Sequence, residues 1–308
     1  MTVMKHAFAL LALAAALPAL AAETPAPFDL SPQQAHIDAP RNPAAIAQIP
    51  AGYKFVEPGT FTVAIAGASG PPLALLASDD KTTIGSEADT ARLIADSLGL
   101  QLKVVQTSWE DWPLGVSSGK YDAVLSNVTV TESRKKRFDF ATYRQDVLGF
   151  YVKASNAITS IKEAKDIAGL KVIVGSGTNQ EKVLLAWNEA NEKAGLAPAT
   201  LVYFDDQAAA TLAVQSGRVD AFFAPNSLLA YIAATRGGIK QVGLVNGGWP
   251  LKADIAVTTR KGNGLVTPIQ TALEGAIAGG QYASVLQRWG LADERIDHSL
   301  INPPGLPD

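Results

Sequence analysis

The sequence contains no cysteine and few histidines, which are His6, His36 and His298. Without cysteine the chain has no disulfide framework, no thiolate metal site, no cysteine nucleophile and no N-terminal cysteine for lipid attachment. His6 lies in the N-terminal leader and the other histidines lie toward the chain ends, so little is left for metal binding or general-base chemistry. We therefore expect no metal site, no cofactor and no catalytic residue.

The sequence also has no excess of positively charged residues. The chain has 26 Lys and Arg against 29 Asp and Glu, which is a formal net charge of −3. A nucleic-acid partner would need a basic face, so we expect none. The 308 residues, 47% hydrophobic and 18% charged, are typical of a globular protein with two modest domains.

A hydrophobic run lies near the N-terminus, over residues 7–17, after the positive charge of Lys5. The run is shorter than the roughly 20 residues of a membrane-spanning helix, and Pro18 interrupts it. Residues 19–21, Ala-Leu-Ala, form a small-x-small cleavage site. We predict a cleaved secretory signal over residues 1–22 and a mature protein that does not span the membrane.

The next segment, residues 23–58, has little periodicity and many prolines. They are Pro25, Pro27, Pro32, Pro40, Pro43, Pro50 and Pro58. Prolines at this density disfavour a helix or a central strand, so we predict an extended N-terminal arm.

From residue 59 onward, short apolar runs alternate with amphipathic segments. One series occupies residues 59–153, a second begins at 154, and the chain returns to the first near residue 254. The predicted strands are 61–66, 102–105, 121–125, 147–152, 171–174, 201–204, 219–223, 241–245 and 254–258, and the longer predicted helices are 86–98, 179–193, 265–278 and 281–289. This alternation predicts an α/β protein with two lobes, 59–153 plus 254–308 and 154–253, whose sheets are mostly parallel and flanked by helices.

A short apolar strand and the polar turn after it form the strongest indication of a binding site. Asn127 and Thr129 follow the strand, and Thr131 is placed to cap the next turn, which carries Arg134. Open α/β sheets bind ligands at the carboxyl ends of their strands. A planar guanidinium with nearby hydroxyl and amide groups suits a carboxylate. We interpret this segment as the anion-binding half of a small-molecule site.

Several motifs carry a resemblance to a known family. They are Gly70-Pro71-Pro72, 85–89, Ser117, 119–123, 131–134, Asp139-Phe140, 168–172, 177–180, 216–221, Lys261-Gly262, 280–282 and 289–290. Their order over about residues 61–291 resembles the extracellular solute-binding proteins of polar amino-acid ABC importers, solute-binding family 3. The resemblance implies the type II periplasmic-binding-protein fold, in which two lobes joined by a two-strand hinge close on a ligand.

The resemblance also implies a function. The protein would be a periplasmic, monomeric, non-enzymatic binding protein that captures an amino acid or an amino-acid-like carboxylate and delivers it to an ABC permease. In the first lobe, Arg134 would hold the ligand carboxylate, Asn127 and Thr129 would contact its main-chain end, and Trp109 would line its side chain. The alternative for Arg134 is a solvated helix surface, and the alternative for Trp109 is the core.

In the second lobe, Thr178 and Asn179 would add N–H donors to the carboxylate at the start of a helix. The alternative is that Thr178 only caps that helix. If Thr178 only caps the helix, the residues next to it can still bind the ligand.

The sequence departs from the family where an aspartate usually holds the α-ammonium of the ligand, because that position is Pro225, followed by Asn226. Either another acid replaces this aspartate, or the ligand is a carboxylate without a free α-ammonium. The acids considered are Asp205, Asp206, Glu110 and Asp111. Two further departures are Gly70, where the family often has an aromatic residue, and Leu73 in place of Phe.

Two functions of other classes fit the same fold. One is a periplasmic dehydratase-like enzyme, for which Glu110 or Glu181 would be the general acid. The other is a ligand-free accessory protein of a periplasmic enzyme, whose cleft would be filled by its own side chains.

Overall fold

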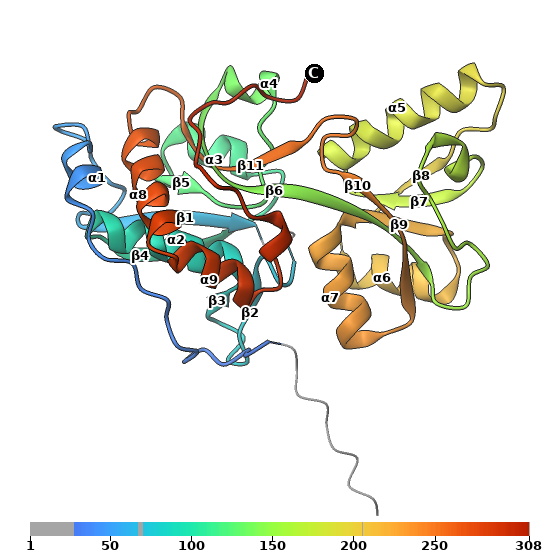
Figure 1. The fold of residues 1–308 in the computed structure, drawn as a ribbon, viewed down its shortest axis with the longest axis horizontal. Helices are drawn as coiled ribbons and strands as arrows, with labels where there is room; N and C mark the ends of the chain where they lie inside the picture. Colours follow the sequence, from blue (N-terminus) through green and yellow to red (C-terminus); the bar gives the residue numbers. More distant parts are fainter. Residues whose placement is uncertain (1–27, 67–69, 205, 308) are drawn as a thin grey trace, which may run out of the picture.

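The structure is a computed structural model that describes residues 28–66, 70–204 and 206–307. The predicted signal peptide, residues 1–22, lies outside the described residues. Two α/β lobes stand side by side, and the long strand β6 runs from one to the other (Figure 1). Within the described ranges, no helix combines the length and the apolar character needed to cross a bilayer.

The first lobe is built on one sheet. Its elements are β1 (Thr60–Ala66), β2 (Leu75–Leu76), β3 (Thr83–Ile84), α2 (Ser86–Leu98), β4 (Gln101–Thr107), α3 (Trp112–Ser118), β5 (Ala123–Val124), α4 (Glu132–Lys135), β11 (Ala253–Arg260), α8 (Val266–Ala278), α9 (Gln281–Arg288) and a 3-10 turn (Ala292–Glu294). Strand β1 pairs in parallel with β4 and β5, and β11 joins this sheet antiparallel to β5.

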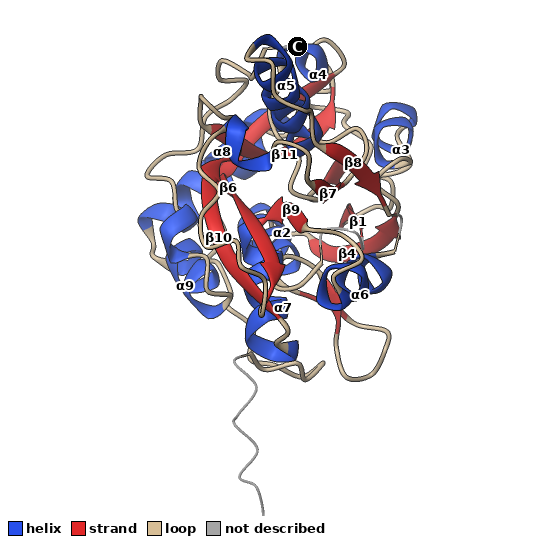
Figure 2. Ribbon diagram, turned by 90° about the vertical axis from the view of Figure 1, so that its right-hand side faces the viewer, coloured by secondary structure: helices blue, strands red, loops and turns tan. Residues whose placement is uncertain are grey.

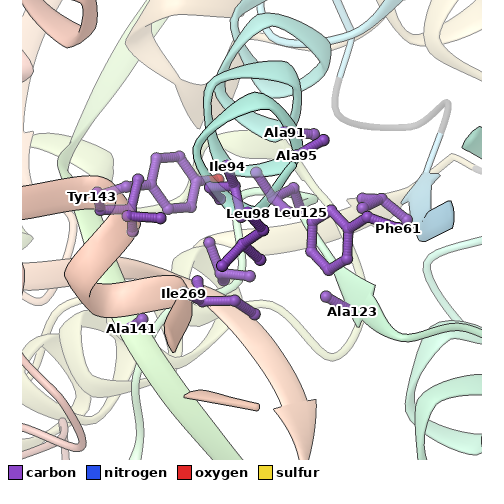
Figure 3. Packing of buried hydrophobic residues seen from close by; sticks show 14 of the residues in the cluster. Phe61, Ala91, Ile94, Ala95, Leu98, Ala123, Leu125, Ala141, Tyr143 and Ile269 are labelled. Carbon is purple, nitrogen blue, oxygen red and sulfur yellow. The ribbon is translucent and has the colours of Figure 1, made fainter. Parts of the chain in front are cut away.

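Helix α2 forms because its apolar residues recur every three or four positions and face the sheet. Ala91, Ile94, Ala95 and Leu98 are buried against Phe61 and its neighbours in the core shown in Figure 3. Helix α8 contributes to the same core, whereas α3 belongs to a separate cluster on the sheet. This packing holds the carboxyl ends of β4 and β5 at one edge of the lobe.

The second lobe has its own sheet and two core clusters. Its elements are a 3-10 turn (Ala164–Ile167), β7 (Lys171–Val174), α5 (Asn179–Lys193), β8 (Thr200–Tyr203), α6 (Gln207–Ser216), β9 (Ala221–Pro225), α7 (Asn226–Arg236) and β10 (Ile239–Asn246). Strand β7 pairs in parallel with β8 and β9. Helix α5 packs in one cluster, and α6 and α7 pack in the other, on opposite sides of the strands (Figure 2). The α/β architecture with two lobes is confirmed.

Strand β6 (Phe138–Lys153) connects the lobes and is longer than predicted. Its first half pairs with β11, and its second half pairs with β9 and β10, all antiparallel. The sequence predicted a strand over 147–152 alone, because the first half contains Asp139, Arg144 and Asp146, charged residues that seldom occupy a buried strand. All three are buried here. The predicted residue boundaries of the lobes stay a prediction.

The N-terminal arm contains a short helix, so the prediction that its prolines prevent one was wrong. Helix α1 (Pro43–Ala47) starts with proline at a position where the missing N–H costs nothing, and the Asn42 side chain accepts a hydrogen bond from the Ala45 N–H at 3.2 Å. Further upstream, the Phe28 ring lies between Trp289 of the first lobe and Tyr231 of the second, with ring centres 5.5 and 5.4 Å away. The arm therefore packs on both lobes.

Candidate functional site

A cavity of about 760 Å³ lies between the two lobes. Its lining comes from the carboxyl ends of β4, β5, β7, β8 and β9 and from the turns that follow them, the edge where α/β sheets bind ligands. All of the site residues predicted from the sequence line it, namely Trp109, Asn127, Thr129, Arg134, Thr178 and Asn179. The fold thus brings together groups from both lobes.

Arg134 is held by the turn that carries it. The Thr131 hydroxyl accepts a hydrogen bond from the Arg134 N–H at 3.2 Å, and the guanidinium Nη1 donates to the Thr129 carbonyl at 2.9 Å. The guanidinium carbon lies 5.5 Å from the ring centre of Trp109 and 5.9 Å from that of Trp112. Burial lowers the pKa of Arg134 to about 10. Among the described residues no carboxylate forms an ion pair with it, so its charge faces the cavity without a counter-charge.

Asn127 lines the cavity, and its side chain is bonded to residues that do not line it. Its side-chain oxygen accepts a hydrogen bond from Arg144, and its Nδ2 donates to Asp146 at 3.4 Å. Its backbone N–H donates to Glu87 Oε1 at 3.2 Å, and its φ of 52° lies in the left-handed region. A ligand would therefore meet the backbone of Asn127 and not its amide.

The start of helix α5 forms the opposing wall. The Thr178 hydroxyl accepts from the Glu181 N–H at 3.2 Å and donates to the Gly175 carbonyl at 2.7 Å. Thr178 therefore caps the helix, as the alternative reading of this residue expected. Asn179 is 7% exposed, and its Nδ2 has no hydrogen-bond partner. An unpaired donor at a helix N-terminus, where the first N–H groups also lack partners, favours an oxygen-bearing ligand.

A buried charged cluster lies directly behind Asn127. We define the hinge cluster as Glu87, Arg144, Asp146 and Glu294. Arg144 is ion-paired with Glu294 and lies 3.8 Å from Asp146. Burial raises the pKa of Glu87 and of Glu294, and it raises that of Asp146 to about 7, although Arg144 opposes each shift. One arginine thus lies among three acids whose pKa values are raised.

The hinge cluster predicts that the folded protein loses stability as pH rises. An Asp whose pKa is higher in the folded than in the unfolded state binds more protons when folded, so its ionisation favours unfolding. For a shift from 3.8 to about 7, the free energy of unfolding should fall by about 2 kcal/mol between pH 5.5 and pH 8. Chemical denaturation of the wild type and of Asp146→Asn at pH 5.5 and pH 8 measures this fall in the free energy of unfolding. The variant should lack most of this slope, and an identical slope in both proteins would contradict the assignment.

The acids considered as replacements for the missing aspartate lie in different places. Glu110 lines the cavity but is exposed. Asp206 caps α6 by accepting from the Ala209 N–H at 2.6 Å, and neither it nor Asp111 lines the cavity. Asp205 lies outside the described residues. Pro225 itself lines the cavity.

The departure at Gly70 has a steric reason. A Cβ atom on Gly70 would lie 2.5 Å from Cδ1 of Leu228, which reaches across from α7 and lines the cavity. Leu228 thus supplies an apolar wall from the second lobe. Leu73 is buried in the core of the first lobe, away from the cavity lining.

Sequence reasoning missed several lining residues of the second lobe, chiefly Tyr203, Gln207, Phe222 and Leu228. Tyr203 ends β8, Phe222 lies within β9, and Gln207 and Leu228 lie in the helices that follow these strands. The rule that ligands bind at strand carboxyl ends could have identified them once those strands were predicted.

Comparisons with known proteins agree with the fold. A sequence model of the bacterial extracellular solute-binding proteins, family 3, matches residues 62–292. The L-cystine-binding protein TcyJ of Escherichia coli K12 is 30% identical over 243 residues, which cover 78% of this chain and 86% of that protein. An ancestral arginine-binding protein solved with arginine is 31% identical, with a TM-score of 0.64 and coverage of 75% and 98%. The ancestral amino acid-binding protein AncCDT-1, a precursor of cyclohexadienyl dehydratase, is 26% identical, with a TM-score of 0.63 and coverage of 75% and 95%.

Proposed function

This chain belongs to the bacterial extracellular solute-binding proteins of family 3, and on that premise we propose that it captures an amino acid or an amino-acid-like carboxylate between its lobes. The observation that carries the proposal is Arg134, a partly buried guanidinium without an acidic partner among the described residues, at the wall of an interlobe cavity. A solute carboxylate would supply the missing counter-charge through paired hydrogen bonds.

The remaining predicted residues have complementary roles in this proposal. Thr129 and the backbone of Asn127 contact the ligand beside its carboxylate, and Trp109 packs on its apolar part. From the second lobe, Asn179 and the capped start of α5 at Thr178 donate to the same carboxylate. Since these donors come from opposite lobes, a bound carboxylate would hold the lobes together, as expected for hinge closure.

The proposed setting follows from the family. The mature chain, released after cleavage of the signal over residues 1–22, acts in the periplasm as a monomer and delivers its solute to an ABC permease. We propose capture without turnover. The carboxylate oxygens of Glu181 accept from the Gly177 N–H and the Tyr203 hydroxyl, each at 2.7 Å, and Glu110 is exposed at the rim. The roomy cavity does not favour the accessory-protein alternative, which expected a cleft filled by side chains.

A thermal-shift screen tests the proposal. Ligand that binds only the folded state at 100 times its Kd stabilises it by about 2.7 kcal/mol, so the Tm should rise by roughly 5–10 °C. The panel contains amino acids, simple organic acids and N-acylated amino acids, each with its methyl ester as the matched control. We expect acids to raise the Tm and their esters to have no effect. The proposal fails if no acid shifts the Tm, or if acid and ester shift it equally.

A further inference from the structure

Two side chains that line the cavity from the second lobe each carry a buried amide nitrogen without a hydrogen-bond partner. One is Asn179 at the start of α5. The other is Gln207 in the first turn of α6, whose Nε2 is buried and has no hydrogen-bond partner. Buried polar groups in native proteins are nearly always paired, and an unpaired donor is costly. Both amides therefore favour a ligand that brings acceptor atoms.

Gln207 is fixed in place by the cap of its helix. Asp206 accepts from the Ala209 N–H at 2.6 Å, which starts α6 at Gln207, a residue of the cavity lining. The N-terminus of this ten-residue helix adds a partial positive charge at the same point. Gln207 and Arg134 belong to different lobes, so they are placed to hold different ends of one solute.

Among the described lining residues, few groups could neutralise a positive charge on the ligand. Glu110 is its one carboxylate in the described ranges and is exposed to solvent. The wall near Gln207 is apolar and includes Phe222, Pro225 and Leu228. The acids of the hinge cluster do not line the cavity, and Asn127 stands between them and it.

Charge balance then separates two classes of ligand. An α-amino acid with an uncharged side chain is a zwitterion, so with Arg134 it would leave one uncompensated positive charge in the cavity. A monocarboxylate without an ammonium group neutralises Arg134 fully. Neutral backbone carbonyls cannot replace a counter-charge for a buried ammonium.

We infer that Gln207 is a specificity-determining residue that donates to a second oxygen acceptor of the solute. The solute class is an acid with one carboxylate for Arg134, an uncharged carbonyl oxygen for Gln207, and no free ammonium beside the carboxylate. This inference rests on the proposed function and narrows its ligand.

Calorimetry with matched acids tests the inference on the full mature protein. The probes are 4-carbamoylbutanoate and N-acetylglutamine, which fit the class, glutamine, which adds a free ammonium, and butanoate, which lacks a second acceptor. We expect glutamine to bind at least tenfold more weakly than the better of the first two. Gln207→Leu should weaken that acid at least tenfold and butanoate less than threefold. Gln101→Leu, an exposed change away from the cavity, is the control.

Any other outcome contradicts either the inference about Gln207 or the proposed function itself. If glutamine binds as well as the better of the two preferred acids, or if Gln207→Leu leaves the affinity for that acid unchanged, the inference is wrong while carboxylate capture stands. If none of the four acids binds and the wider panel also gives no shift, the proposed function fails together with the inference. Circular dichroism of Gln207→Leu shows whether any loss comes from misfolding.

Discussion

Replacing Arg134 by alanine is expected to weaken solute binding by at least about 100-fold, which corresponds to about 2.7 kcal/mol. The variant removes a charge-assisted contact in a desolvated site, where truncating one partner of an ion pair costs about 2–5 kcal/mol. The empty protein should keep its Tm within a few degrees, because Arg134 forms no ion pair in the described structure and gives up one hydrogen bond to the Thr129 carbonyl. Calorimetry and thermal denaturation measure the two quantities.

Two variants make the Arg134 result specific. Lys135→Ala removes a neighbouring charge whose partner is Glu132 at 3.0 Å, and it should leave affinity unchanged within a factor of about two. Arg134→Lys keeps the charge but loses the planar fork, so intermediate affinity is expected. Equal losses in Lys135→Ala and Arg134→Ala would mean that general surface charge, and not this guanidinium, attracts the solute.

The second large effect is on stability. Arg144→Met should lower the free energy of unfolding by about 3–5 kcal/mol and the Tm by roughly 10 °C. Arg144 is fully buried and holds Glu294 and Asp146, so its removal leaves buried acids without their cation. Denaturant titration of the purified variant measures the loss.

The pH dependence of that loss identifies its cause. Burial favours the protonated form of the acids of the hinge cluster, and protonation increases as pH falls, so the loss should be larger at pH 8 than at pH 5.5. Adding Glu294→Gln to Arg144→Met should restore part of the stability. Arg236→Met, an exposed change at the end of α7, should cost less than about 0.5 kcal/mol. If Arg144→Met is as mild as this control, the cluster does not stabilise the hinge region.

Local patterns were enough to predict much of this fold. The boundaries of α2 and α5 follow from apolar residues that recur with the helical period and from a glycine or a threonine at an end. The placement of Arg134 follows from its distance along the chain from a buried strand and from the Thr131 cap. Such features depend on residues that are close together in the sequence, so they can be predicted from one sequence alone.

Features that depend on distant parts of the chain could not be predicted in the same way. The first half of β6 buries Arg144, whose partners are Asp146 and, from the far end of the chain, Glu294. Nothing near Arg144 in the sequence indicates the second partner. In the sequence, Gln207 is not distinguished from other polar residues. Only the structure shows that it lines the cavity and that its Nε2 has no hydrogen-bond partner.

A crystal structure of the mature protein with a bound acid, chosen from the thermal-shift screen, is the most direct test. We predict that both carboxylate oxygens of the solute lie within about 3.2 Å of the Arg134 guanidinium nitrogens, between the two lobes. A solute whose carboxylate lies elsewhere, with Arg134 still bonded to protein carbonyls alone, would contradict our account of this site.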